Sequence, residues 1–137
     1  MANKIVGGIY YFKVWQEDTQ REQFKIYVYI CEINGKPVFV KVNSKYYSWT
    51  VQTTIYKKDY PNIDIIQEEK SYIDCARPIR GISLYDFDSK CEKGYQGSLC
   101  LVDLIDLNNT IKTVKTLSPK EKKIIEDALN TRICELL

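Results

Sequence analysis

The chain has 137 residues, of which 45% are hydrophobic and 28% are charged, and its formal net charge is +2. This composition fits one globular domain and excludes a disordered chain, and so small a net charge does not by itself indicate a nucleic-acid partner. The chain contains no histidine, which excludes a Ser-His-Asp triad, a Cys-His pair and an HExxH zinc site. Any chemistry must therefore rest on Arg, Lys, Ser, Thr, Tyr, Asp or Glu.

The first elements predicted along the chain are strands. Residues 5–15 open with a glycine pair and continue as an aromatic-rich strand, and the polar residues 16–22 are expected to form a solvated loop. Residues 24–33 alternate, which predicts a strand with two different faces. Asn-Gly within residues 34–36 favours a type I′ turn, so that 37–44 returns as the partner strand of a hairpin. The two faces of the first hairpin strand would carry, respectively, Phe24, Ile26, Val28 and Ile30, and Lys25, Tyr27 and Tyr29.

The middle of the chain is less regular. Residues 46–60 contain several threonines and aromatic residues without a clear period. Two short strands are predicted over 63–66 and 71–76, on either side of a polar turn, and 77–83 is compatible with a continuation of the second strand. With the hairpin, these strands favour a mainly β fold.

The last third of the chain contains a clear helix. Residues 85–96 are polar and are predicted to form a loop, whereas 97–107 fit either a helix or a strand. Ser118, Pro119 and Glu121 occupy the N-cap, N1 and N3 positions of a capping box, so a helix should begin there. Its apolar stripe should pack on the sheet and consists of Ile124, Ile125, Ala128, Leu129, Ile133 and Leu136.

The five cysteines are expected to be free. A disulfide framework and a metal site are the functional alternatives, but the count is odd and no CxxC pair occurs. Residues 5–12 are too short for a secretory signal, and no apolar run approaches the ~20 residues of a membrane span. We therefore expect a cytoplasmic protein without a membrane partner, with thiols that act as small apolar groups. The paired carboxylates in turns show no ligand spacing, so neither a metal nor another cofactor is expected.

Four segments resemble, in order, the MazF/PemK (Kid-like) toxins. They are VGGIYYFKV at 6–14, VFVKVNS at 38–44, SYIDCARPIRGIS at 71–83 and LSPKEKKIIEDAL at 117–129. The resemblance implies that residues 1–137 form one small SH3-like barrel, related to CcdB, of about five to seven strands closed by the C-terminal helix. Two departures are evident: Lys25 and Ile26 stand where the family has an Arg-Pro step, and residues 85–108 contain an insertion.

The same resemblance implies a metal-independent endoribonuclease that cuts single-stranded RNA. Ser44 would correspond to the family's Thr or Ser, and Lys25 to its Arg, with Arg21 close enough in the preceding loop to substitute. A guanidinium can stabilise the charge that develops on a phosphate without titrating. Arg77 and Arg80 would either line the RNA groove or pair with Asp74 and Asp86. A homodimer and a cognate antitoxin-like protein are the partners that the resemblance implies.

Tyrosines and lysines cluster in the sequence, and this clustering supports a binding surface. In a basic aromatic groove, tyrosine rings could stack on unpaired bases while lysines contact the phosphates. Lys45, Tyr46 and Tyr47 are the candidate RNA-binding residues of this cluster. The alternative is that tyrosines fill both faces of a small barrel. The full set consists of Tyr27, Tyr29, Tyr46, Tyr47, Tyr56, Lys41, Lys45, Lys57 and Lys58. The competing function is a non-catalytic barrel that binds a protein or a nucleic acid.

Overall fold

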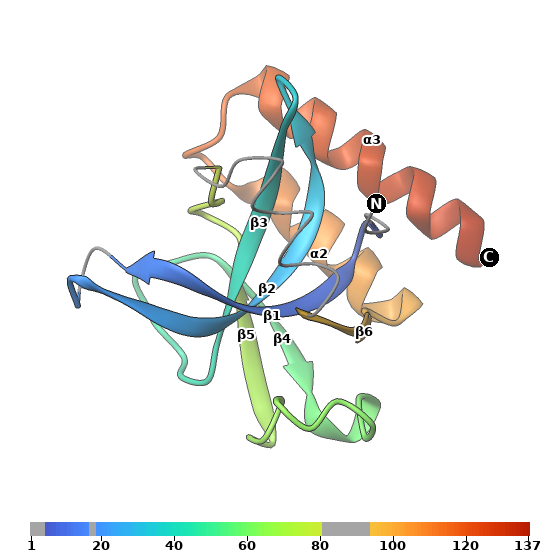
Figure 1. The fold of residues 1–137 in the computed structure, drawn as a ribbon. Coiled ribbons are helices and arrows are strands. Elements are labelled where there is room, and N and C mark those ends of the chain that lie inside the picture. The colour runs from blue at the N-terminus through green and yellow to red at the C-terminus, as the bar shows by residue number, and fades with distance from the viewer. Residues whose placement is uncertain (1–4, 17–18, 81–93) are drawn as a thin grey trace.

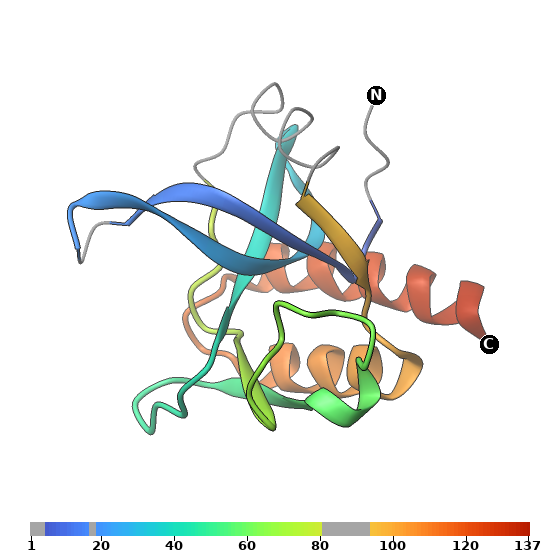
Figure 2. The same cartoon turned by 60° about the horizontal axis from the view of Figure 1, so that its bottom comes forward.

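A computed structural model describes residues 5–16, 19–80 and 94–137. Its described strands form one curled antiparallel sheet, a half-barrel, in the order β4-β5-β3-β2-β1-β6 (Figure 1). Helices α2 and α3 pack on each other and on the sheet (Figure 2). The expected mainly β class with helices is thus confirmed. The elements are β1 (Gly8–Gln16), β2 (Arg21–Ile33), β3 (Lys36–Asn43), β4 (Gln52–Tyr56), the 3₁₀ turn η1 (Lys57–Asp59), β5 (Lys70–Asp74), β6 (Tyr95–Ser98), α2 (Leu101–Thr113) and α3 (Pro119–Leu136).

Two consecutive hairpins build the centre of the sheet. The predicted turn between β2 and β3 is confirmed, because Asn34 and Gly35 have φ angles of 53° and 75°, the left-handed values that a type I′ turn requires. The predicted loop over 16–22 is too long. Gln16 pairs with Arg21 at the end of the β1–β2 ladder, so both residues belong to strands. Cross-strand pairing thus extends into a segment whose polar composition alone favoured a loop.

Strand β2 buries both of its faces. Val28 and Ile30 belong to a large core that also includes residues of β3, β5 and the two helices. Tyr27 and Tyr29 belong to a second, mainly aromatic core on the opposite face of the sheet. Rings in this second core meet edge to face or stack, which is the geometry that aromatic pairs prefer. Its members are Tyr10, Phe12, Tyr27, Tyr29 and Phe39.

The segment 63–66 was predicted as a strand, and this prediction is wrong. The amide of Ile63 donates to the carbonyl of Tyr60, and the amide of Ile66 donates to that of Ile63, so the chain turns twice here. Both isoleucines are nevertheless buried. Apolar residues at three-residue spacing in successive turns look like a short buried strand when only the sequence is read. The strand predicted over 71–76 is confirmed over 71–74 as part of β5, which ends at Asp74, and Ile79 beyond it bridges to Phe39.

The two helices cover the larger core. The segment 97–107, which fitted either a helix or a strand, is mostly helical. Gly97 and Ser98 are the last residues of β6, and α2 begins at Leu101. In α2 the core contacts come from Leu104, Leu107 and Ile111. The capping box of α3 is confirmed, and its stripe buries Ile125 and Leu129 fully, while Leu136 at the far end is exposed. No helix among the described residues is long and apolar enough to cross a membrane.

Candidate functional site

A groove of about 440 Å³ opens at one end of the curled sheet. The outer part of the β1–β2 hairpin, the end of β3 with the loop that follows it, and the segment 65–71 form its walls. Both polar and aromatic side chains line it. The lining consists of Tyr11, Phe24, Lys25, Ile26, Lys41, Val42, Asn43, Ser44, Lys45, Tyr47, Ile65, Gln67, Glu68 and Ser71.

One wall of the groove is aromatic. The rings of Tyr11 and Phe24 stack with centroids 5.1 Å apart at an angle of 24°, and Phe24 is 55% exposed. Lys13 pairs with Phe24 across the strands, and its Nζ lies 5.9 Å from the Phe24 ring centroid. Trp15, two residues further along β1 and therefore on the same face, is 50% exposed. The outer hairpin thus presents a row of accessible rings that continues the groove wall.

The groove is electropositive. Lys25, Lys41 and Lys45 line it, against Glu68 as the one acidic member of the lining. Among the described residues, neither Lys25 nor Lys45 forms an ion pair. The exposed Ser44 stands directly after the end of β3 and belongs to the same lining. Lys25 alternates with Phe24 and Ile26 along β2 and so leaves the opposite face of the strand, while Ser44 and Lys45 follow β3. An anionic ligand at this end of the sheet would therefore have lysines and a hydroxyl donor nearby.

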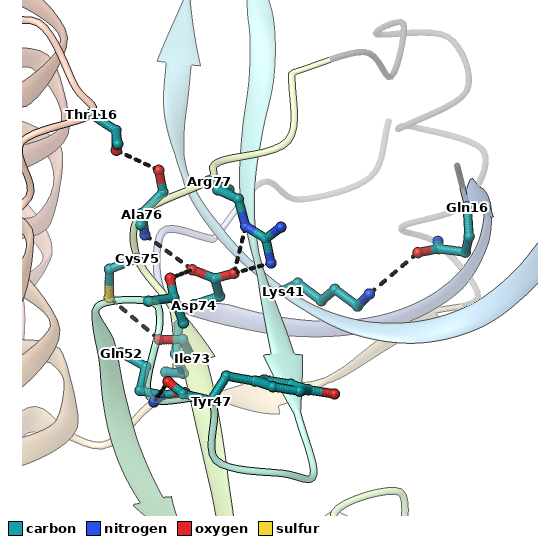
Figure 3. Close-up of polar contacts among 11 residues, drawn as sticks. Gln16, Lys41, Tyr47, Gln52, Ile73, Asp74, Cys75, Ala76, Arg77 and Thr116 are labelled. Carbon is teal, nitrogen blue, oxygen red and sulfur yellow. Dashed lines mark hydrogen bonds and ion pairs between the residues drawn. The ribbon is translucent and has the colours of Figure 1, made fainter. Parts of the chain in front are cut away.

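Lys41 is held by a small polar network below the groove. Its Nζ donates to Oε1 of Gln16 at 3.3 Å (Figure 3). Nε2 of Gln16 in turn donates to the hydroxyl of Tyr27 at 3.1 Å. Gln16 and Tyr27 are both buried. Burial raises the pKa of Tyr27, and the hydrogen bond from Gln16 partly offsets this rise. The network fixes Lys41 against the aromatic core rather than leaving it mobile in solvent.

Asp74 fixes an exposed arginine beside a tryptophan. The buried carboxylate of Asp74 accepts hydrogen bonds from Nε and Nη2 of Arg77 at 3.2 and 2.9 Å, from the Thr50 hydroxyl at 2.8 Å and from the Ala76 amide at 3.1 Å (Figure 3). The Arg77 guanidinium also lies 4.3 Å from the centroid of Trp49, and its side chain is 62% exposed. Arg77 is thus held in place from two sides while part of it stays accessible.

Aromatic contacts connect this arginine to the groove. The rings of Tyr47 and Trp49 are 5.4 Å apart, and Tyr47 lines the groove. The carbonyl of Tyr47 accepts a hydrogen bond from Nε2 of Gln52 at 2.7 Å, which ties the loop to β4 (Figure 3). A row of side-chain contacts therefore runs from Tyr47 in the groove lining through Trp49 to Arg77.

The structure brings four of the eight sequence-predicted site residues into one place. Lys25, Ser44, Lys45 and Tyr47 all line the groove. Arg21 is exposed at the start of β2 and is not part of the lining. Arg21 pairs with Gln16 in the last pair of the β1–β2 ladder, so it lies in a strand near the hairpin tip and not in a loop as predicted.

The remaining predicted residues lie elsewhere. Arg77 forms an ion pair with Asp74, which was the alternative to a place in the groove lining. Arg80 pairs with Glu121 at the start of α3, with 2.7 Å between Nη1 and Oε2, while the expected partner Asp86 lies outside the described residues. Tyr46 is exposed and packs edge to face against Tyr72.

The tyrosine groove drawn from the sequence is wrong for Tyr27 and Tyr29. Both are buried in the aromatic core, which agrees with the alternative that tyrosines fill both faces of the sheet. Tyr56 lies on β4, between Lys58 and Lys70, and does not line the groove. Besides the predicted Tyr46 and Tyr47, the rings of Phe24, Trp15 and Trp49 are exposed and Tyr11 lines the groove, and the sequence did not single out these four as site residues.

A usable signal for these rings was present in the sequence. The alternation of 24–33 puts Phe24 on the face of Ile26 and Val28, which suggested a core position. In the register of β1 against β2, Phe24 pairs with Lys13 near the hairpin tip, beyond the core. On this face of β2 the buried part of the strand therefore ends near Ile26. A lysine and a tryptophan at alternate positions of the partner strand indicate where burial ends.

The described residues contain no group of three side chains suited to a metal ion. The described cysteines are free, and burial raises the pKa values of Cys31 and Cys75 to about 12, so these two thiols are not nucleophiles at neutral pH. Comparison of the chain with protein families, with curated proteins and with solved structures finds no match. The functional proposal therefore rests on the geometry and chemistry of the groove.

Proposed function

We propose that the groove binds a single-stranded nucleic acid, with RNA as the expected ligand. The observation that supports this most directly is that the stacked rings of Tyr11 and Phe24, two lysines and a hydroxyl belong to the lining of one hollow. Within the part of the chain that the structure describes, these two lysines, Lys25 and Lys45, form no ion pair. Proteins that bind single strands combine a basic groove for the phosphates with aromatic rings on which bases stack. A net charge of only +2 is compatible with this function, because the positive groups are concentrated locally.

In the proposed complex each part of the groove has a separate role. Unpaired bases would stack on Phe24 and Trp15, whose rings are half exposed. Lys25 and Lys45 would contact consecutive phosphates. A phosphate further along the strand would reach Arg77, whose guanidinium Asp74 already orients, so little entropy would be lost when it binds.

Binding can be measured by fluorescence anisotropy with labelled ten-nucleotide RNA, the same DNA and an RNA duplex. We expect the single strands to bind and the duplex to bind more weakly. Phe24→Ala should lower the affinity by about tenfold or more, because stacking contributes roughly 1–3 kcal/mol per base. Lys120→Gln is the matched control, since Lys120 is exposed on α3 and away from the groove.

Equal affinity of wild type and of Phe24→Ala would contradict a stacking role for this wall. Equal effects of Lys25→Gln and Lys120→Gln would contradict the assignment of the phosphate path to the groove. A preference for RNA over DNA would identify contacts to the 2′-hydroxyl.

The second candidate is that bound RNA is cut in the groove. It is favoured by one further observation, that Ser44 and Lys25 line the same hollow. The 2′-oxygen would bond to the adjacent phosphorus, the bond from phosphorus to the 5′-oxygen would break, and the proton of the 2′-hydroxyl would reach the leaving oxygen through solvent. Lys25 would neutralise the charge on the phosphoryl oxygens and Ser44 would donate a hydrogen bond to one of them.

The resemblance to the MazF/PemK-like toxins supports this candidate, and with it an SH3-like barrel and an antitoxin-like protein that covers the groove. The test is incubation of RNA with the protein in EDTA, with growth arrest on expression as the second readout. We expect cleavage by wild type, loss with Ser44→Ala, and activity retained or raised with Lys25→Arg, because a guanidinium binds phosphate through two donors. If the protein binds RNA but never cuts it, the proposal of a nuclease is contradicted, and the proposal of single-strand binding stands.

A further inference from the structure

We propose that two copies of the chain pair through their β4 strands, antiparallel, around a twofold axis that passes between the two Thr54 residues. Strand β4 is the last strand of the described sheet and pairs only with β5 on one side. Its other edge faces outward (Figure 1). The groove of the proposed nucleic-acid site is lined by residues of β3 and β5 but by none of β4, so the two proposals rest on different residues.

The hydrogen-bond register identifies which backbone groups of β4 point outward. The amide of Cys75 donates to the carbonyl of Val51 at 2.9 Å, and the amide of Lys57 donates to that of Glu69 at 3.0 Å. In an antiparallel ladder, bonded pairs alternate with non-bonded pairs. Thr53 and Ile55 are therefore bonded to β5 as well, while the backbone groups of the residues between them face away from the sheet.

Three residues of β4 thus present a free N–H and C=O at the edge: Gln52, Thr54 and Tyr56. Among the described residues, no backbone or side-chain group bonds to these six groups. All three residues are partly or fully exposed. The arrangement is symmetric about Thr54, so a second copy in antiparallel orientation can satisfy all six groups at once.

The side chains of β4 do not protect this edge. Natural edge strands commonly carry a charged residue or a proline that prevents pairing with another chain. The sequence QTTIY contains neither. In the proposed register Thr54 faces its own copy, a favourable cross-strand pair, and Gln52 faces Tyr56. Lys57 and Lys58, which follow the strand, would face Val51 and Thr50 rather than each other.

The space beside the edge can hold a strand. A groove of about 410 Å³ runs between β4 and α2, and its helix side is formed by the acidic Asp106 and the uncharged Asn109, Thr110 and Thr113, which share one face of α2. An extended peptide of another protein could also occupy such an edge. The symmetry of the free groups and the uncharged strand favour a second copy.

The test is sedimentation equilibrium of the wild type and of single variants at residue 54 over roughly 10 to 500 µM protein, because a short two-strand interface should give a concentration-dependent dimer. We expect wild type and Thr54→Val to dimerise. Thr54→Pro should be monomeric, since proline removes the outward N–H at the centre of the interface but is tolerated at a sheet edge.

A charge pair makes the test specific for this register. Thr54→Lys and Thr54→Glu should each be monomeric, because residue 54 would face an identical charge across the axis, whereas an equal mixture of the two should form a heterodimer. Circular dichroism checks that each variant is folded, and the charge pair decides the outcome if Thr54→Pro does not fold. A monomeric wild type throughout the concentration range, a dimer that survives both Thr54→Pro and Thr54→Lys, or a mixture that stays monomeric would each overturn the proposal.

Discussion

Tyr60 shows how one side chain can join distant parts of this chain. Its buried hydroxyl donates to Oδ2 of Asp103 at 2.5 Å and accepts a hydrogen bond from the amide of Cys100 at 3.0 Å, so it connects η1 to the start of α2. Burial, and then the bond to Asp103, raises the pKa of this hydroxyl well above its usual range, so it remains a donor. The Asp103 carboxylate also lies in the first turn of α2, where the helix dipole favours a negative charge.

Tyr60→Phe should therefore destabilise the protein. It removes the hydroxyl donor to the buried Asp103 carboxylate and leaves there the weaker Cys100 thiol donor at 3.4 Å, which should lower the free energy of unfolding by about 1–3 kcal/mol. Urea titration followed by circular dichroism measures the effect. Tyr46→Phe is the control, since Tyr46 is exposed, and it should change the free energy little. Equal stabilities of the two variants would show that Asp103 finds another partner.

Cys75 predicts a loss of stability at alkaline pH. Burial, chiefly, raises its pKa from 9.0 to about 12. The unfolded thiol therefore ionises first, and the stabilisation is complete below pH 9 and is lost as the pH rises from 9 towards 12. One such group contributes a slope of up to about 1.4 kcal/mol per pH unit. Urea titrations from pH 9 to 12 should show that the free energy of unfolding falls less steeply with pH for Cys75→Ala than for wild type. The exposed Cys134→Ala is the control and should give the same pH dependence as wild type.

At the scale of elements, local sequence signals succeeded where a single residue type decides the backbone. The Asn34-Gly35 turn and the Ser118 capping box were both predicted, because positive φ angles and N-cap hydrogen bonds depend on the residues themselves. The helix α2 and the turns at 63–66 could not be assigned, because a short apolar run has the same pattern in a strand, a helix or successive turns. Only the packing of these residues in the larger core distinguishes them.

The cap gives a prediction at this scale. The Ser118 Oγ accepts from the amide of Glu121 at 3.1 Å, and Oε1 of Glu121 accepts from the amide of Ser118 at 3.4 Å. Ser118→Ala should lower the free energy of unfolding by about 1 kcal/mol, because an amide at the helix start loses its partner. Ser118→Asp should restore most of that loss, and thermal unfolding of the three proteins provides the comparison. An alanine variant as stable as wild type would mean that water replaces the cap without penalty.

At the scale of the whole molecule, the proposed binding site is spread over segments that are distant in sequence. Lys25, Ser44 and Glu68 come together only because the sheet curls and the 65–71 segment turns back over its open end. The charge of this site is local, and its effect on binding should therefore depend on salt.

Salt dependence gives the prediction at this scale. For a single strand, the slope of log affinity against log salt changes by about 0.7 for each phosphate contact. Lys45→Gln should make the slope shallower by about that amount, whereas Trp15→Ala should lower the affinity and leave the slope unchanged. Anisotropy titrations at several salt concentrations measure both quantities. A lysine variant with an unaltered slope would place the phosphate path outside the groove.

The amino-acid sequence by itself determined what depends on local chemistry: the mainly β class, the β2–β3 hairpin, the capped final helix and the exclusion of histidine chemistry. The family resemblance suggested Ser44 and Lys25 as site residues and the clustering of lysines and tyrosines suggested Lys45, and all three belong to the lining of one groove. Tertiary structure alone decided which aromatic residues are accessible. Tyr27 and Phe24 lie on one strand and have similar rings, but the first is buried and the second is exposed. Strand register and sheet curvature set that difference, and both arise from contacts between segments that no local pattern encodes.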